Sequence, residues 1–369
     1  MRLGLVGSLI CIVVASMAAY GPAAASTPVP TDATAEATAA PTPAPAGTTV
    51  ITLMTHDSFA ASEGVMAMFE TAQHAQVKLL PSGDAGAALN QAILSKNNPL
   101  ADVFYGVDNT LLTRALDAGI FEPYASPGLA DIPDQYKLDP QNRLLPVDYG
   151  DVCLNYDKAW FAKKGLNPPA NLEALIQPAY KGLTVVENPA TSSPGLAFLL
   201  ATISHFGDPG YLDYWKALRA NDVLVVDGWQ EAYYGQFTAA SQGSYPIAVS
   251  YASSPPAEVY FSKTPLTEAP TGVVTADGSC FRQIEFVGIL KGTQHQALAE
   301  KLVDFMLSKP FQEDMPLQMF VFPVNRTASL PDVFTRFAVL PKNPVYMDPQ
   351  TIGAKRQAWI EAWTQAVLR

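Results

Sequence analysis

From Val50 onward, short apolar runs alternate with helical patterns, and this alternation constrains the fold more than any other feature of the sequence. TVITLMTH at 49–56 predicts a buried strand, and SEGVMAMFETAQ at 62–73 predicts a helix. The same order of strand and helix follows in VKLL (77–80), AGAALNQAILSK (85–96), DVFYG (102–106) and NTLLTRALDAG (109–119). Repeated strand–helix units imply an α/β fold with a parallel sheet covered by helices.

A second alternating set begins after the extended stretch LLPVDYGDVCLNYD at 144–157. Its predicted elements are LTVVEN (183–188), PGLAFLLATISHF (194–206), DVLVV (222–226), YPIAVSY (245–251) and the long strand FRQIEFVGIL (281–290), with a mainly helical remainder. Two such sets predict two lobes facing across a ligand cleft, with 49–147 and 285–369 in lobe 1 and 148–284 in lobe 2. The chain would cross near Pro146–Gly150 and return near Arg282–Phe286, which gives a two-stranded hinge.

The loops after the first three strands are candidate ligand loops, because ligands of such sheets bind beyond the carboxyl ends of the strands. These loops cover residues 56–58, 82–86 and 106–109. The Gly-rich SGDAGAAL opens a helix, so it is either an anion-binding site or an ordinary turn between a strand and a helix. TSSPG at 191–195 is typical of a helix cap.

Composition narrows the class of ligand. Hydrophobic residues make up 49% and charged residues 15% of the 369 residues, an ordinary globular balance. The formal net charge of −11 argues against nucleic acid as a partner and is compatible with a small cation.

The N-terminus predicts export. Arg2, the apolar run to Ala19 and the small residues Ala23–Ala25 form a signal peptide over 1–25, and a retained membrane anchor is the alternative. Residues 26–48 are rich in Pro, Ala and Thr and predict an extended linker. The mature protein would then be periplasmic or held at the cell surface.

Catalytic and metal signatures are absent from the sequence. There is no G-x-S-x-G, phosphate-binding P-loop, H-E-x-x-H or C-x-x-C, and the four histidines show no metal-ligand spacing. We therefore predict that the protein is not an enzyme and that it has neither a cofactor nor a metal site. An enzyme that uses His56 beside an acidic residue is the weaker alternative.

VDGWQEAYYG at 226–235 concentrates aromatic residues. Asp227 with Gln230 predicts a capping box at a helix start. Trp229, Tyr233 and Phe237 would then share one face, with the last two in the core and Trp229 at a cleft.

Several motifs together resemble one family. They are LMTHDSFA, ADVFYGVDNTLL, PVDYGDVCLNYD, NPATSSPGLAFLL, DGWQEAYYG, VSYASSP, FPVN and RQAWIEAWTQAV. In this order they resemble the thiamine-binding proteins of ABC importers, which are type II periplasmic binding proteins, and the resemblance covers Val50 to Arg369.

The resemblance implies a monomeric receptor that closes on thiamine or its phosphates and delivers it to a membrane permease. In this family an aromatic cage holds the ligand, and it maps to Trp229, Tyr251 and Phe320. His56 stands where the family has Tyr, Ala257 lies near another lost Tyr, and Asp151 replaces a commonly aromatic residue. The candidate ligand-binding residues are His56, Asp57, Ser58, Asp84, Ala85, Asp108, Asp148, Tyr149, Ser193, Trp229, Tyr251, Ser254 and Phe320.

Other cargoes remain as alternatives, namely a polyamine or a ferric ion. Iron sites use paired tyrosines, and Tyr233 and Tyr234 are adjacent. Neighbouring helical residues point about 100° apart, which disfavours a shared ion.

Cys153 and Cys280 are the only cysteines left after removal of the signal peptide. Export places them in an oxidising compartment, so we expect a disulfide, with two buried thiols as the alternative.

Overall fold

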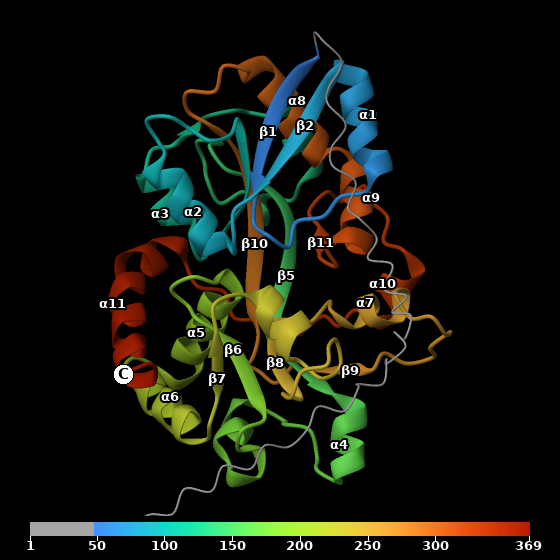
Figure 1. Ribbon diagram of the computed structural model, residues 1–369. Coiled ribbons are helices and arrows are strands. Elements are labelled where there is room, and N and C mark those ends of the chain that lie inside the picture. The colour runs from blue at the N-terminus through green and yellow to red at the C-terminus, as the bar shows by residue number, and fades with distance from the viewer. Residues whose placement is uncertain (1–47) are drawn as a thin grey trace, which may run out of the picture. The chain divides into compact units, whose positions relative to one another are not determined.

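The computed structural model describes residues 48–369, so the predicted signal peptide and nearly all of the linker lie outside the described residues. Within 48–369 the strands form one 11-stranded sheet in which eight strands follow the order β2-β1-β3-β10-β5-β8-β6-β7 (Figure 1). Those strands are β1 Thr49–Thr55, β2 Ala75–Pro81, β3 Val103–Asp108, β5 Leu145–Asp157, β6 Thr184–Glu187, β7 Leu224–Val226, β8 Ile247–Tyr251 and β10 Phe281–Leu290. Short strands β4 Phe121–Glu122, β9 Thr271–Val274 and β11 Phe322–Pro323 pair with β10 or β5.

The expected parallel pairing is confirmed at the two flanks of the sheet. Strands β2, β1 and β3 are parallel to one another, as are β8, β6 and β7. The centre differs, because β10 is antiparallel to both β3 and β5, and β5 is antiparallel to β8. The two long strands connect the predicted sets of elements and return in opposite directions, so their mutual pairing has to be antiparallel.

The segments predicted as a hinge lie side by side in this central pair. Gly150 pairs with Gln283 and Asp148 with Glu285, and the register shifts between Glu285 and Phe286. The hinge itself stays a prediction, although its two predicted segments are paired with each other in the sheet.

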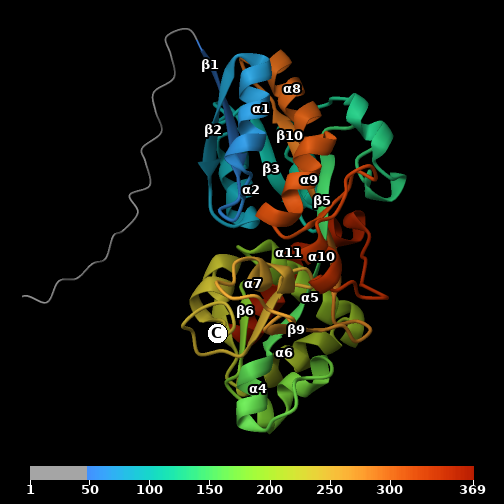
Figure 2. The same ribbon diagram turned by 90° about the vertical axis from the view of Figure 1, so that its right-hand side faces the viewer.

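The helices predicted at 62–73, 85–96, 109–119 and 194–206 are present, and the segment after 290 is mainly helical as expected, whereas α4, α6 and α7 were not predicted. The helices are α1 Glu63–Gln73, α2 Ala85–Leu94, α3 Leu112–Asp117, α4 Lys158–Lys164, α5 Ser193–Phe206, α6 Gly210–Ala220, α7 Pro255–Tyr260, α8 Gln296–Leu307, α9 Lys309–Gln318, α10 Asp332–Phe337 and α11 Pro349–Val367. Helix α1 packs beside α8 and α9 (Figure 2), and α11 contacts both α3 and α6. Within residues 48–369, no helix combines the length and the apolar character needed to cross a bilayer.

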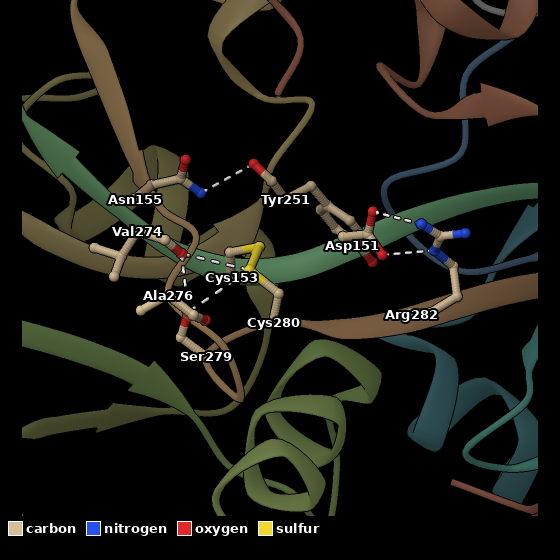
Figure 3. Close-up of a disulfide and its surroundings, with 9 residues drawn as sticks. All are labelled: Asp151, Cys153, Asn155, Tyr251, Val274, Ala276, Ser279, Cys280 and Arg282. Carbon is tan, nitrogen blue, oxygen red and sulfur yellow. Dashed lines mark hydrogen bonds and ion pairs between the residues drawn. A yellow bond between two sulfur atoms is a disulfide. The ribbon is translucent and has the colours of Figure 1, made fainter. Parts of the chain in front are cut away.

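The predicted disulfide between Cys153 and Cys280 is present (Figure 3). It joins β5 to the residue before β10, across 127 positions of sequence. Each cysteine has a charged residue two positions away, Asp151 before Cys153 and Arg282 after Cys280. Arg282 donates to the carboxylate of Asp151 with distances of 2.5 and 2.9 Å. A covalent bond and a bidentate ion pair thus fasten the same two strands.

Candidate functional site

A cavity of about 320 Å³ opens where loops from both sets of elements meet. Its lining comes from the loop after β1, the start of α2, the start of α5, the turn after β7, the end of β8, α7, β10 and the segment after α9. The lining residues are His56, Asp57, Ser58, Phe59, Ala60, Asp84, Ala85, Ser193, Pro194, Trp229, Gln230, Tyr233, Tyr234, Tyr251, Ser254, Ala257, Phe261, Glu285, Gln318, Met319, Phe320 and Val321. Ten of the thirteen predicted ligand-binding residues are in this set, so the sequence placed most of them at one site.

Aromatic rings cluster around Trp229 on one side of the cavity. Trp229 stacks on Tyr233 with centroids 5.1 Å apart and planes 14° apart, and Tyr234 meets it edge-on at 5.3 Å. Tyr251 lies 6.3 Å away at 67°. The indole Nε1 donates to Ser250 Oγ at 2.9 Å, which fixes the orientation of the ring. The half-buried indole is therefore held in one position with part of its surface open to the cavity.

The predicted capping box at Asp227 is wrong. Asp227 is exposed, and no hydrogen bond of its side chain caps the helix. The N–H of Trp229 instead donates to Asp84 Oδ2 at 3.2 Å, from a loop 145 positions away. The turn that follows, Glu231–Gln236, is π-helical. Such turns occur mostly as single turns and frequently at functional sites.

Asp84 also accepts the N–H of Ser193 at 2.9 Å, so one carboxylate serves the starts of two helical segments. Burial raises the pKa of Asp84, whereas the two backbone N–H donors lower it, and burial prevails. Gln230 Nε2 donates to the carbonyl oxygen of Asp57 at 2.7 Å beside this pair. The loops after β1 and β2 are thereby bonded to the Trp229 segment and to α5.

The other side of the cavity is acidic. Glu285 lines it from β10, and His56 Nε2 lies 3.5 Å from Glu285 Oε1. Nδ1 of His56 accepts the N–H of Ser58 at 3.2 Å, which leaves Nε2 as the ring nitrogen that faces Glu285. Beneath them Tyr105 OH bonds both Asp148, at 2.6 Å, and Glu285, at 2.9 Å. Burial, and then the charge of Glu285, raises the pKa of Asp148 well above its usual value.

Three predicted ligand residues lie outside the lining. Asp108 is fully buried and bonds to Ser193 Oγ and Thr110, so it supports a lining residue from below. Asp148 is turned toward Tyr105. Tyr149 points to the opposite face of β5, where it stacks on Tyr136 at 5.0 Å. Successive residues of a strand face opposite sides, and neither side of β5 reaches the cavity at these positions.

Several lining residues were missed by the sequence analysis, and Glu285 and Phe261 matter most. Glu285 is the one acidic residue in the otherwise mainly apolar run FRQIEFVGIL, and that contrast could have singled it out. Phe261 follows α7 and is an ordinary loop aromatic in sequence. Tyr233 and Phe237 are buried, as expected, although Tyr233 also reaches the lining.

The geometry does not favour an iron site. The rings of Tyr233 and Tyr234 are 87° apart, and Tyr233 OH donates to Glu258. Burial raises the pKa of Tyr233 well above its usual value, so the phenolate that iron requires is disfavoured. In the part of the chain that the structure describes, no group of three or more His, Cys, Asp or Glu is placed to hold a metal.

Comparison with known proteins supplies the family context. Residues 98–339 match the family described as bacterial extracellular solute-binding protein. The thiamine-binding periplasmic protein of Salmonella typhimurium is 34% identical over 328 residues, which cover 87% of this chain and 94% of the relative. A solved periplasmic thiamin binding protein has a TM-score of 0.77 at 29% identity, and the match covers 87% of this chain and 97% of that protein. Iron-bound HitA from Pseudomonas aeruginosa has a TM-score of 0.69 at 19% identity over 86% of this chain and 99% of that one, a likeness of fold alone.

Proposed function

Because this chain belongs to the bacterial extracellular solute-binding proteins, we propose that it captures thiamine, or a phosphate ester of thiamine, outside the cytoplasm. It then delivers the ligand to the permease of an ABC importer. In this proposal the protein is exported, acts as a monomeric receptor and performs no chemistry on its cargo.

The observation that carries the proposal is the pairing of an aromatic wall with carboxylates in one cavity. Trp229, Tyr251 and Phe320 supply flat apolar surface, and Asp57, Asp84 and Glu285 supply negative charge. Across residues 48–369, neither Lys nor Arg contributes to the lining. A flat cation satisfies both sets of groups, because it stacks on rings and is attracted to their electron-rich faces.

Thiamine has this chemistry, with a fixed positive charge on one flat ring and hydrogen-bonding groups on the other. Stacking on a desolvated ring contributes about 1–2 kcal/mol of binding free energy. The acidic side of the cavity adds attraction to the charge and acceptors for an aminopyrimidine. A polyamine would use the carboxylates but leave the aromatic wall without a matching surface.

The central strand pair provides a route for closure. Within the sheet formed by residues 48–369, β5 and β10 link the two predicted lobes, and their paired residues include 148–150 and 283–285. Glu285 of this pair lines the cavity. A small change of twist in this pair would bring the Trp229 side toward the His56 side. Ligand would favour the closed arrangement because it contacts both sides at once.

Calorimetry tests the proposal directly. The wild-type protein should bind thiamine or its monophosphate at low micromolar concentration or tighter, and more tightly than spermidine or ferric ion. If the protein gave no binding heat with thiamine but strong binding heat with spermidine, its ligand would be a polyamine, bound by the same fold. Appearance of cleaved thiamine during the titration, abolished in His56→Ala, would favour an enzyme instead.

A further inference from the structure

Helix α7 and the residue after it contribute Ala257 and Phe261 to the cavity lining. Helix α7 is separated from β8 by residues 252–254, and Ala257 in its first turn lines the cavity with only a methyl group. Ala257 is buried together with Phe320, Phe322 and Phe334. A ligand ring against this wall would meet a methyl group with aromatic residues behind it.

Phe261 lies one helical turn beyond Ala257 and also lines the cavity. Its side chain is 67% exposed, which is unusual for a phenylalanine that belongs to a cavity lining. The ring packs edge-on against Phe320 at 5.6 Å and against Tyr260 at 5.1 Å. An apolar ring that borders a binding cavity and is mostly in water has surface left for a ligand.

Phe320 is the buried residue on which Phe261 packs in this part of the cavity wall. It is 8% exposed and has a φ of +53°, a left-handed backbone that bulky residues rarely adopt. Such strain persists only where the surroundings impose it, and it concentrates at ligand sites. Phe320 therefore gives Phe261 a fixed surface to pack on.

We propose that Phe261 is a ligand-contacting residue that covers the outer face of a bound aromatic ring and selects planar cations over flexible ones. The inference rests on the proposed function and assigns part of its selectivity to one side chain. Phe261 supplies above Ala257 the aromatic surface that Ala257 lacks. A linear polyamine offers no ring face to cover, so it gains little from this contact.

The test compares Phe261→Ala with Tyr260→Ala. Tyr260 is the adjacent residue of the same aromatic cluster, is 48% exposed and does not line the cavity, so it is a matched control. We expect Phe261→Ala to weaken thiamine binding about 5- to 30-fold, the fold-change of a desolvated cation–π contact. Tyr260→Ala should change it less than about 2-fold, within the usual effect of a surface substitution.

Spermidine supplies the second comparison. Its affinity should be the same in wild type and Phe261→Ala, so the preference for thiamine falls in that variant alone. Phe261→Leu keeps an apolar side chain but removes the aromatic ring. If the π face carries the contact, this variant should lose as much thiamine affinity as Phe261→Ala. Melting temperatures of both ligand-free variants should match wild type, because the side chain is mostly exposed.

The outcomes that overturn the inference differ from those that overturn the proposed function. Unchanged thiamine affinity in Phe261→Ala, with wild type binding thiamine, contradicts the role of Phe261 alone. An equal loss in Tyr260→Ala also contradicts it, because the effect would then belong to the exposed cluster as a whole. No thiamine binding by the wild type contradicts both.

Discussion

The central strand pair and the cavity walls are built in opposite ways. In β5 and β10 the residues are almost all buried, and a disulfide and an Arg–Asp ion pair join the strands. The cavity walls include the exposed rings of Tyr234 and Phe261, a π-helical turn, and a phenylalanine with left-handed backbone. We expect stability to depend mainly on the central pair and binding mainly on the cavity walls, with Glu285 as a residue of both. Substitutions in the two regions should therefore change different measurements.

Removal of the disulfide should have the largest effect, and on stability alone. The bond closes a loop of 127 positions, so in the double variant Cys153→Ala/Cys280→Ala the free energy of unfolding should fall by about 5 kcal/mol in the chain-entropy model. Urea denaturation measures this, and dithiothreitol should destabilise wild type but not the variant. Thiamine affinity at low temperature should stay within about 2-fold. A large loss of affinity in a folded variant would mean that the central pair also shapes the cavity.

Trp229→Ala should show the reverse pattern. Loss of a stacking wall should remove about 1–3 kcal/mol of binding free energy, a range taken from base–aromatic stacking. The melting temperature of the ligand-free protein should change little. Trp160→Ala, a half-buried tryptophan on α4 outside the lining, is the matched control for tryptophan fluorescence quenching. Intact affinity with a stability loss of about 3–5 kcal/mol would instead place Trp229 in the core.

Asp84→Asn should affect both stability and binding, because this residue lines the cavity and also accepts backbone N–H groups at the starts of two helical segments. An amide offers one acceptor oxygen where the carboxylate offers two, so one of the N–H groups of Ser193 and Trp229 loses its partner. We expect a loss of about 1–2 kcal/mol in stability, together with weaker binding. Asp57→Asn is the control, since Asp57 lines the cavity but is exposed and should change binding only. A binding effect without a stability effect in Asp84→Asn would rule out its capping role.

The smallest expected effect concerns pH. Burial and the charge of Glu285 raise the folded-state pKa of Asp148 above its usual value near 3.8, so the folded state holds this proton more tightly than the unfolded state. That contribution is present below the usual pKa and is lost as pH rises through the raised pKa. Asp148→Asn keeps an acceptor for Tyr105 and removes the titration. Its melting temperature should therefore fall less than that of wild type as pH rises above about 4, and parallel curves would contradict the shift.

The sequence predicted the helices and strands better than it predicted which way individual side chains face. The spacing of apolar residues located the alternating strands and helices, because burial imposes one period on helices and another on strands. The local pattern at Asp227 failed because the cap comes from Asp84, and no local rule contains a donor–acceptor pair 145 positions apart. Asp148 and Tyr149 were predicted at the cavity, but their side chains face Tyr105 and Tyr136 instead. The orientation of β5 depends on pairing partners far along the chain, which no local pattern contains.

The insertion of β10 between β3 and β5 has a consequence for how the chain is made. Synthesis presents the N-terminal part first, with β3 and β5 formed from residues that precede β10 by more than a hundred positions. Until Phe281–Leu290 follows, each of these strands lacks one neighbour and offers a free edge to other chains. Early folding is then a hazard rather than an advantage. The cell gains by keeping the chain unfolded until its last part has arrived, and a prematurely terminated chain would be a seed for aggregation.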